Sequence, residues 1–392
     1  RAAEEPISAA LDAFRAIGDR RGEAWSLQNL AWIAFSDGRV EAADQHIHAS
    51  EEAFREVGDL GGLAWVQGLS AFVRFQQGDF RTAGELAARI LRECERRGDR
   101  FGEGMMHLVQ SNIELWTGHP GGAAASAAQA AAAFRSAGDL ADTIGLEQAL
   151  ALGGRAEVMA GNVSKGRHLI MEAVRVTDGP AADFALAVGH LTDVQVGRPE
   201  GLLDIPAADW LAAGRGIPAR TAQQYAARAL ALAQCAREQE ALPLARRAVQ
   251  EAPDGGYEAA ALALVAAACG LDEEARSAAD LVADLPRSTY LDRLTAQLAV
   301  AVSDLGPAGD AALSSAREEL GLGEDLIAVA LVQLAAGVRA EACGTDDGGA
   351  GADGERLLVE LGLTETRWRD LFRTAVVHAA GRAAGSLDGV PG

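Results

Sequence analysis

The sequence is poor in the features that build metal sites, disulfide frameworks and nucleic-acid interfaces. Its four cysteines are far apart and form no CxxC pair, so neither a structural zinc site nor a disulfide framework is expected. The formal net charge of −21 argues against binding DNA or RNA through this segment, because the phosphates would be repelled. We expect buried thiols in a reducing, cytoplasmic protein, with no metal and no cofactor.

Aromatic residues and long apolar runs are also scarce. Aromatics make up only 5% of the residues, although hydrophobic residues reach 49% and alanine supplies many of them. An alanine-rich sequence with few β-branched residues favours close-packed helices over sheets. We find no signal peptide and no apolar run of the roughly 18 residues that cross a bilayer, so no membrane partner is expected. The chain begins at Arg1, within a helical pattern, and we expect it to be a piece of a longer protein.

Catalytic motifs are missing as well. No stretch reads GxxxxGK followed by Ser or Thr, and no GxSxG elbow occurs. The segment from Gly349 to Gly354 matches the letters of the dinucleotide fingerprint but has no strand before it, so we interpret it as loop. Asp346, Asp347 and Asp353 lack the spacing of a calcium loop, and we interpret them as linker. We therefore expect no catalytic residue and no enzyme activity in this chain.

What the chain does contain is a repeat. The segment Phe14–Trp25 reads FRAIGDRRGEAW, and similar segments recur at Phe54–Trp65 and at Cys94–Met105, 40 residues apart each time. A fourth, more divergent copy begins at Phe134. Self-similarity at a fixed period of this size is typical of a solenoid, in which each unit buries its apolar face against its neighbour.

The repeat predicts tandem pairs of helices. Residues 3–17 form one expected helix, and the first complete pair spans about Gly22–Ser36 and Val40–Val57. The tight turns within the pairs recur at Gly38, Gly78 and Gly118, whereas the next, Gly161, comes three residues late. The fourth unit therefore carries a small insertion.

The second half has a shorter period. Cys235, Cys269 and Ser303 are 34 residues apart, and each lies near the end of an expected first helix of a pair. A helix over Glu324–Ala342 follows. The predicted organisation is a solenoid over 1–198, a Pro/Gly-rich junction with a short helix around Trp210 over 199–218, helix pairs over 219–344, a flexible acidic loop over 345–354, and terminal helices with a frayed tail over 355–392.

Small residues at equivalent positions complete the pattern, with Ala31, Ala71 and Ser111 in one row and Ala43 and Ala83 in another. This pattern resembles the tetratricopeptide repeat, in its long form over residues 14–137 and more weakly to about 180; the 34-residue spacing is that of ordinary tetratricopeptide repeats. The resemblance implies an all-α fold, a right-handed α-solenoid of about nine helix pairs. The sequence departs from the family where an apolar residue is expected, at Gln67, Arg74, His107 and Glu114.

In such solenoids the first helix of each pair lines a concave groove that binds partners. The resemblance places eleven residues there: Trp25, Gln28, Trp32, Phe35, Trp65, Phe72, Phe75, Met105, Leu108, Asn112 and Trp116. These residues either contact an apolar peptide or form the core between neighbouring units, and the sequence leaves both interpretations open. Gln67, Arg74, His107 and Glu114 are candidate polar anchors for a ligand, or else partners in contacts between repeats such as an Arg74–Glu114 ion pair.

The composition, the long repeats and the terminal segment ELGLTETRWRDLFRTAV also resemble the C-terminal region of actinobacterial multidomain regulators. In that family an ATPase core is joined to a DNA-binding or nucleotide cyclase effector, and the solenoid is taken as the sensor arm. The resemblance implies a regulatory module in signal transduction or transcription that binds a protein, a peptide or a small inducer, and that contacts other domains of its parent protein. A free-standing adaptor that assembles partners is the alternative, and an enzyme is the third possibility.

Overall fold

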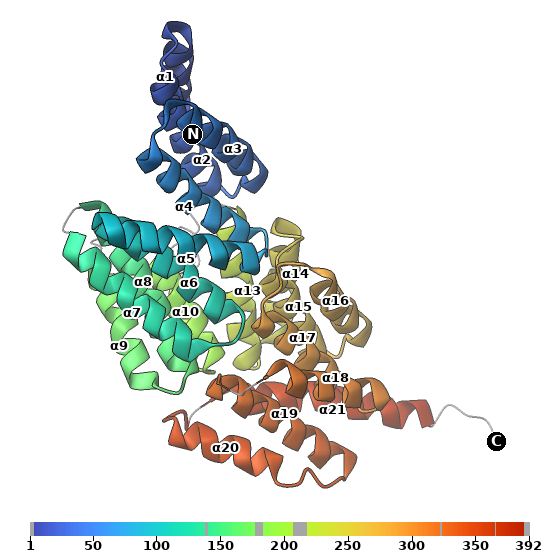
Figure 1. Ribbon diagram of the computed structural model, residues 1–392. Helices are drawn as coiled ribbons and strands as arrows, with labels where there is room; N and C mark the ends of the chain where they lie inside the picture. Colours follow the sequence, from blue (N-terminus) through green and yellow to red (C-terminus); the bar gives the residue numbers. More distant parts are fainter. Residues whose placement is uncertain are drawn as a thin grey trace. The chain divides into compact units, whose positions relative to one another are not determined.

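The computed structural model is built from helices throughout its described parts, which are residues 4–137, 140–176, 183–206, 218–321, 324–364 and 366–387 (Figure 1). No strand occurs in these ranges, and consecutive helices pack against each other in pairs. The predicted all-α architecture of tandem helix pairs is confirmed. The expected helix around Trp210 falls outside the described residues.

Contacts along the backbone divide the chain into two compact units. Unit 1 comprises Arg1–Ile113 and Ala125–Ala149, and unit 2 comprises Glu114–Ala124 and Leu150–Gly392. This division is separate from the change of repeat length that the sequence places near residue 198. Each unit is described below by itself.

The first eight helices follow the 40-residue period closely. The expected pair is found with nearly the predicted bounds, since its helices are α2 and α3. The bounds are α1 Glu4–Ile17, α2 Arg20–Ser36, α3 Val40–Val57, α4 Leu60–Gln76, α5 Phe80–Arg97, α6 Arg100–Trp116, α7 Pro120–Ala137 and α8 Leu140–Met159.

The repeated Gly-Asp pair ends one helix and begins the next. Gly58 follows α3 with φ of 67°, a left-handed conformation that glycine adopts without a steric penalty. The carboxylate of Asp59 then accepts a hydrogen bond of 2.9 Å from the amide of Gly62, which caps the N-terminus of α4. The same arrangement recurs 40 residues away on either side, at Gly18 with Asp19 and at Gly98 with Asp99.

The aromatic residue that opens the repeat explains the glycine eight positions later. The ring of Phe54 is fully buried against Gly62, and a Cβ placed on Gly62 would lie 2.1 Å from that ring. Phe14 lies in the same way on Gly22, at 2.3 Å. The ring at the end of one pair is thus seated on the backbone of the next, and only glycine leaves room for it.

The fourth copy shows where the predicted insertion lies. Phe134 packs on Gly145, which is eleven residues later instead of eight. Helix α8 has 20 residues, whereas α2, α4 and α6 have 17 each. The three additional residues therefore lengthen the beginning of α8 and delay the turn at Gly161.

Unit 2 continues with helix pairs whose core is rich in alanine. In α15 every residue from Glu258 to Ala268 is buried, because alanine lets helices approach on all sides. The bounds are α9 Val163–Val176, α10 Asp183–Gln195, α11 Glu200–Leu203, α13 Pro218–Gln234, α14 Glu238–Glu251, α15 Gly256–Ala268, α16 Asp272–Asp284, α17 Tyr290–Ser303, α18 Pro307–Glu319, α19 Leu326–Cys343, α20 Ala350–Glu360 and α21 Trp368–Leu387.

The predicted acidic loop over 345–354 is only half correct, because α20 already begins at Ala350. The carboxylate of Asp347 accepts hydrogen bonds of 2.8 Å from the amides of both Gly349 and Gly351. These bonds satisfy the first turn of the helix and hold the pKa of Asp347 below its usual range. The glycine-rich composition is typical of a loop, yet Asp347 and the glycine amides here form the start of a helix.

Helix α19 lies close to the predicted bounds, but it shows that the expectation of no apolar run of about 18 residues is wrong. It is the one described helix that is long and apolar enough to cross a membrane, with a mean hydropathy of 1.7 over 18 residues, and 61% of that stretch is buried in the protein. Its Arg339 is only 4% exposed and donates to the carbonyls of Ala301 and Gly306, each at 2.9 Å, and to that of Asp304. The helix packs as a core element of unit 2.

Candidate functional site

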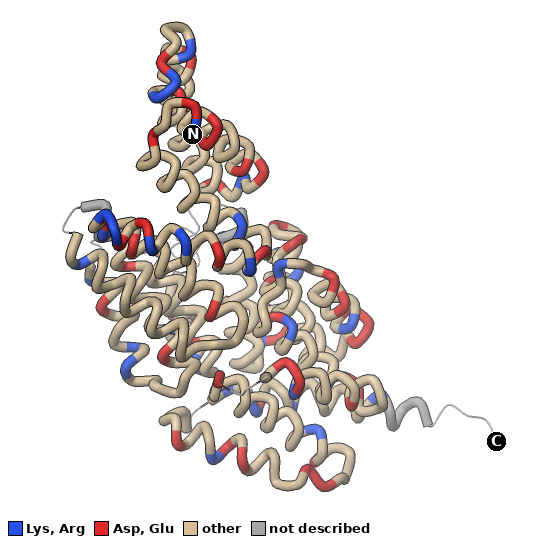
Figure 2. The backbone as a smooth tube through the Cα atoms, in the orientation of Figure 1, with Lys and Arg blue, Asp and Glu red and all other residues tan. Residues whose placement is uncertain are grey.

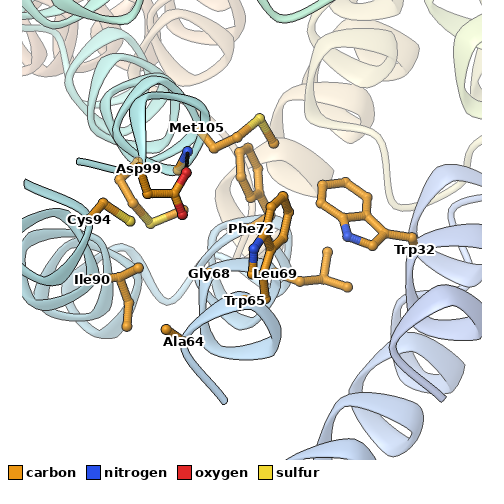
Figure 3. Close-up of a pocket in the computed structure, with 12 residues that line it drawn as sticks. Trp32, Ala64, Trp65, Gly68, Leu69, Phe72, Ile90, Cys94, Asp99 and Met105 are labelled. Atoms are coloured by element: carbon orange, nitrogen blue, oxygen red, sulfur yellow. Dashed lines mark hydrogen bonds between the residues drawn. The ribbon is translucent and has the colours of Figure 1, made fainter. Parts of the chain in front are cut away.

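An apolar hollow opens within unit 1, where α4, α5 and α6 meet (Figure 3). Its volume is about 30 Å³, and Asp99 contributes the only charged side chain of its wall. The hollow is lined by Trp32 of α2, by Ala64, Trp65, Gly68, Leu69 and Phe72 of α4, by Ile90 and Cys94 of α5, by Asp99, and by Gly102, Met105 and Met106 of α6.

The hollow has a buried floor and a half-buried rim. Leu69, Cys94 and Met106 are at most 3% exposed and form the floor together with other buried side chains. The rim consists of residues that retain contact with solvent, which are Trp32, Trp65, Phe72 and Met105. All four rim residues belong to the predicted groove, and the structure brings them together around one opening.

The hollow is centred on a missing side chain. Gly68 occupies the position of Gln28 in the preceding repeat and Leu108 in the next one, 40 residues away in each direction. Gln28 and Leu108 are 4% and 1% exposed, so in both neighbours this position fills the core. Gly68 has no side chain, and the terminal methyl of Met106 lies 3.3 Å from where its Cβ would stand. The hollow therefore opens beside a position that carries a buried side chain in both neighbouring repeats.

Aromatic contacts hold the rim in place. The rings of Trp32, Phe35 and Phe72 form a triangle with centroid distances of 5.9, 6.0 and 6.2 Å. Trp65 stacks on Phe101 at 5.4 Å. Such pairs stabilise a fixed arrangement by about 0.5–1.5 kcal/mol beyond area burial. The rim is therefore preformed.

The electrostatic character of the hollow is neutral. Asp99 accepts a hydrogen bond of 2.9 Å from the amide of Gly102 and lies 3.5 Å from Arg97, so its charge is already compensated. Burial raises the pKa of the Cys94 thiol to about 11, so this cysteine stays protonated and is a poor nucleophile. The hollow thus offers mainly apolar contact.

Three of the predicted groove residues lie in the core instead. Gln28, Phe75 and Leu108 are at most 4% exposed, which leaves no surface for a partner. Their positions on the first helices point between helices, and the sequence period alone does not distinguish the inward face from the outward one. Trp25, which is half-buried, packs edge-on against the buried Phe54 at 5.1 Å.

The remaining predicted residues lie outside the hollow. Asn112 is half-buried and donates to the carbonyl of Leu108 at 2.8 Å. Trp116 and Glu114 belong to the stretch of α6 assigned to unit 2. Gly68 is absent from the predicted groove, although a glycine at a position that is Gln and Leu in the neighbouring copies distinguishes it in the sequence.

Two of the candidate polar anchors have polar contacts: Arg74 with the second helix of the preceding pair, and His107 within its own helix. Arg74 donates to Asp44 of α3 at 2.9 Å and to Gln77 at 2.8 Å, so its carboxylate partner is Asp44 instead of the predicted Glu114. His107 lies 3.0 Å from Gln110. Gln67 is half-buried on α4.

A larger cavity of about 340 Å³ lies in unit 2 beside α19, α20 and α21. Three of its charged side chains are paired, since Arg369 contacts both Glu341 and Glu355. Its glycine-rich edge is closed by Asp347, whose carboxylate occupies the place that a phosphate would take at the amides of Gly349 and Gly351. The fingerprint letters therefore do not form an anion site.

Unit 2 also buries acidic groups, one of which caps a helix. Burial raises the pKa of Glu258 to about 8 and that of Asp325 to about 6. Asp325 caps α19 by accepting from the amide of Ala328 at 3.0 Å, and it also accepts from the hydroxyl of Tyr290. Among the described residues no group of three or more His, Cys, Asp or Glu side chains is arranged to hold a metal ion.

Comparison with models of known protein families and with curated proteins gives no match. The interpretation of the site therefore depends on its own geometry.

Proposed function

We propose that unit 1 is a non-catalytic binding module that holds a segment of another polypeptide against α2, α4 and α6. The observation that supports this is the preformed hollow, with four half-buried apolar residues around a floor that is almost inaccessible to solvent. Aromatic and methionine side chains at an opening of this kind are typical of protein-binding surfaces.

The size of the hollow favours a polypeptide over a free small molecule. Sites for small ligands usually enclose about 300–1,000 Å³, whereas this hollow has about 30 Å³. A small molecule would bury too little of its surface there to gain affinity. A polypeptide can place one side chain in the hollow and cover the surrounding rim with the rest of its surface.

We further propose that this module is the sensor or regulatory arm of a larger protein. The resemblance of the repeats to those of multidomain regulators supports this role, together with the placement of the hollow on the first helices of the pairs. A sensor arm requires a ligand that binds one conformation of the parent better than another. The partner or inducer captured by unit 1 would supply that difference.

Selection of peptides from a random 16-residue phage library on the full chain tests the binding function. We expect enriched peptides to lose at least about tenfold in affinity for the Trp32→Ala/Phe72→Ala variant, because about 1.4 kcal/mol corresponds to a factor of ten and two rim side chains are removed. Leu60→Ala is the matched control, since it removes an apolar side chain that is 76% exposed and lies outside the hollow. Helicity measured by circular dichroism should be unchanged in both variants.

Failure to enrich any peptide, or equal binding to the rim variant and the wild type, would refute the proposal. Loss of helicity in the rim variant would show that these residues act in the core.

A further inference from the structure

We propose that the hollow takes one aliphatic side chain, of the size of Leu, Ile or Met, from an uncharged stretch of the partner polypeptide. This inference rests on the proposed binding function and adds the chemistry of the partner. Its central feature is Gly68: the partner supplies the side chain that this repeat lacks.

The volume of the hollow is too small for an aromatic side chain of the partner. A cavity needs about 10–15 Å³ to hold one water molecule, and an engineered cavity of about 150 Å³ binds benzene. The hollow, at about 30 Å³, lies near the lower end of this range. It accepts the terminal methyl group of an aliphatic side chain, whereas an aromatic ring is too large for it.

The lining decides against a polar anchor. Floor and rim are apolar, and the one charged group of the wall, Asp99, already accepts from the amide of Gly102 and lies 3.5 Å from Arg97. A hydroxyl or amide placed among the apolar side chains would leave water without a hydrogen-bond partner from them, which disfavours its binding.

Charge complementarity indicates that the flanking residues of the partner are uncharged. The first helices carry no Asp, Glu, Lys or Arg over residues 24–36, 60–73 and 104–113. The second helices are more highly charged. In α5, for example, many Arg and Glu side chains appear as blue and red bands along the helix in Figure 2. A charged partner would lose hydration on this neutral surface without gaining an ion pair. Binding should therefore respond little to salt.

A focused selection tests this chemistry. The probe is a 16-residue Ala/Gln helical host with four randomised positions at i, i+3, i+4 and i+7, selected on the full wild-type chain. We expect Leu, Ile or Met to be enriched at one position, and the preference at that position to be lost on Gly68→Leu, which fills the hollow from inside. Gly68→Ala is the milder variant: it needs only a small shift of the flexible Met106 side chain, and we expect it to weaken an enriched peptide at least about threefold.

The outcomes separate the two proposals. If no peptide prefers the wild type over Trp32→Ala/Phe72→Ala, the binding function and this inference both fail. If peptides bind but carry Phe, Trp or a charged residue at the anchor, or bind Gly68→Leu and Gly68→Ala as well as the wild type, only this inference fails.

Two further measurements complete the test. The dissociation constant of an enriched peptide should change less than about twofold between 50 and 500 mM NaCl, because the surface is neutral; a tenfold weakening overturns the inference. Self-association of the wild-type chain that Gly68→Leu abolishes would identify a second copy as the occupant and would also overturn it.

Discussion

Two adjacent glycines at the start of α4 should respond in opposite directions to the same substitution. A Cβ on Gly62 would lie 2.1 Å from the ring of Phe54, whereas a Cβ on Gly61 would meet only the carboxylate of Asp59, at 3.4 Å. Alanine in a helix is favoured over glycine by about 0.5–1 kcal/mol. Forcing an extra methyl group into a close-packed core costs about 1–3 kcal/mol. Phe54 is 0% exposed, so its ring has no free space into which it can move.

We therefore expect Gly61→Ala to raise the free energy of unfolding by about 0.5–1 kcal/mol and Gly62→Ala to lower it by about 1–2 kcal/mol after the helix gain is subtracted. Urea unfolding followed by circular dichroism measures both changes against the wild type. The double variant Phe54→Leu/Gly62→Ala should be less destabilised than the sum of the two single variants, because the clash and the ring disappear together. Equal shifts for Gly61→Ala and Gly62→Ala would refute the explanation of the repeat given above.

Two other predictions concern unit 2. Burial raises the pKa of Glu258 to about 8, so the folded state binds a proton more tightly than the unfolded state. The stability that this proton contributes is lost as the pH rises towards 8. We expect Glu258→Gln to reduce the fall of the thermal midpoint between pH 5 and 8.5, whereas Glu273→Gln, at an exposed position, should leave that fall unchanged. Arg339→Met should lower the free energy of unfolding by about 2–4 kcal/mol, because several carbonyls at the end of α17 lose their donor; a urea-measured loss below about 1 kcal/mol would contradict this.

The parts of the fold that follow from local chemistry could be predicted from the sequence. A helix end with a left-handed glycine and an Asp cap uses only neighbouring residues, so Gly58 and Asp59 already specified the boundary between α3 and α4. The start of α20 was missed because its cap, Asp347, stands in a glycine-rich stretch with the composition of a linker.

The candidate site could be predicted only in part, for a different reason. The rim residues Trp32, Phe72 and Met105 could be chosen from their place on the first helices. Leu108 has the same place on its first helix, yet it is buried, with 1% exposure. Which face of a helix remains open depends on how closely neighbouring pairs approach, and that distance is set by many side chains together. The ion pair of Arg74 with Asp44 has the same origin, since it joins α4 to α3, the second helix of the preceding pair.

The regularity of the repeat is what permits the hollow to exist. The caps and the seating of Phe54 on Gly62 fix where each pair begins and how it meets the next. Because those contacts do not involve position 68, its side chain can be removed without shifting the register of the helices. The framework set by these contacts leaves position 68 free to vary, and with glycine there a hollow lies beside it. A partner of the proposed kind would supply at this place the packing that Gln28 and Leu108 provide within their own repeats.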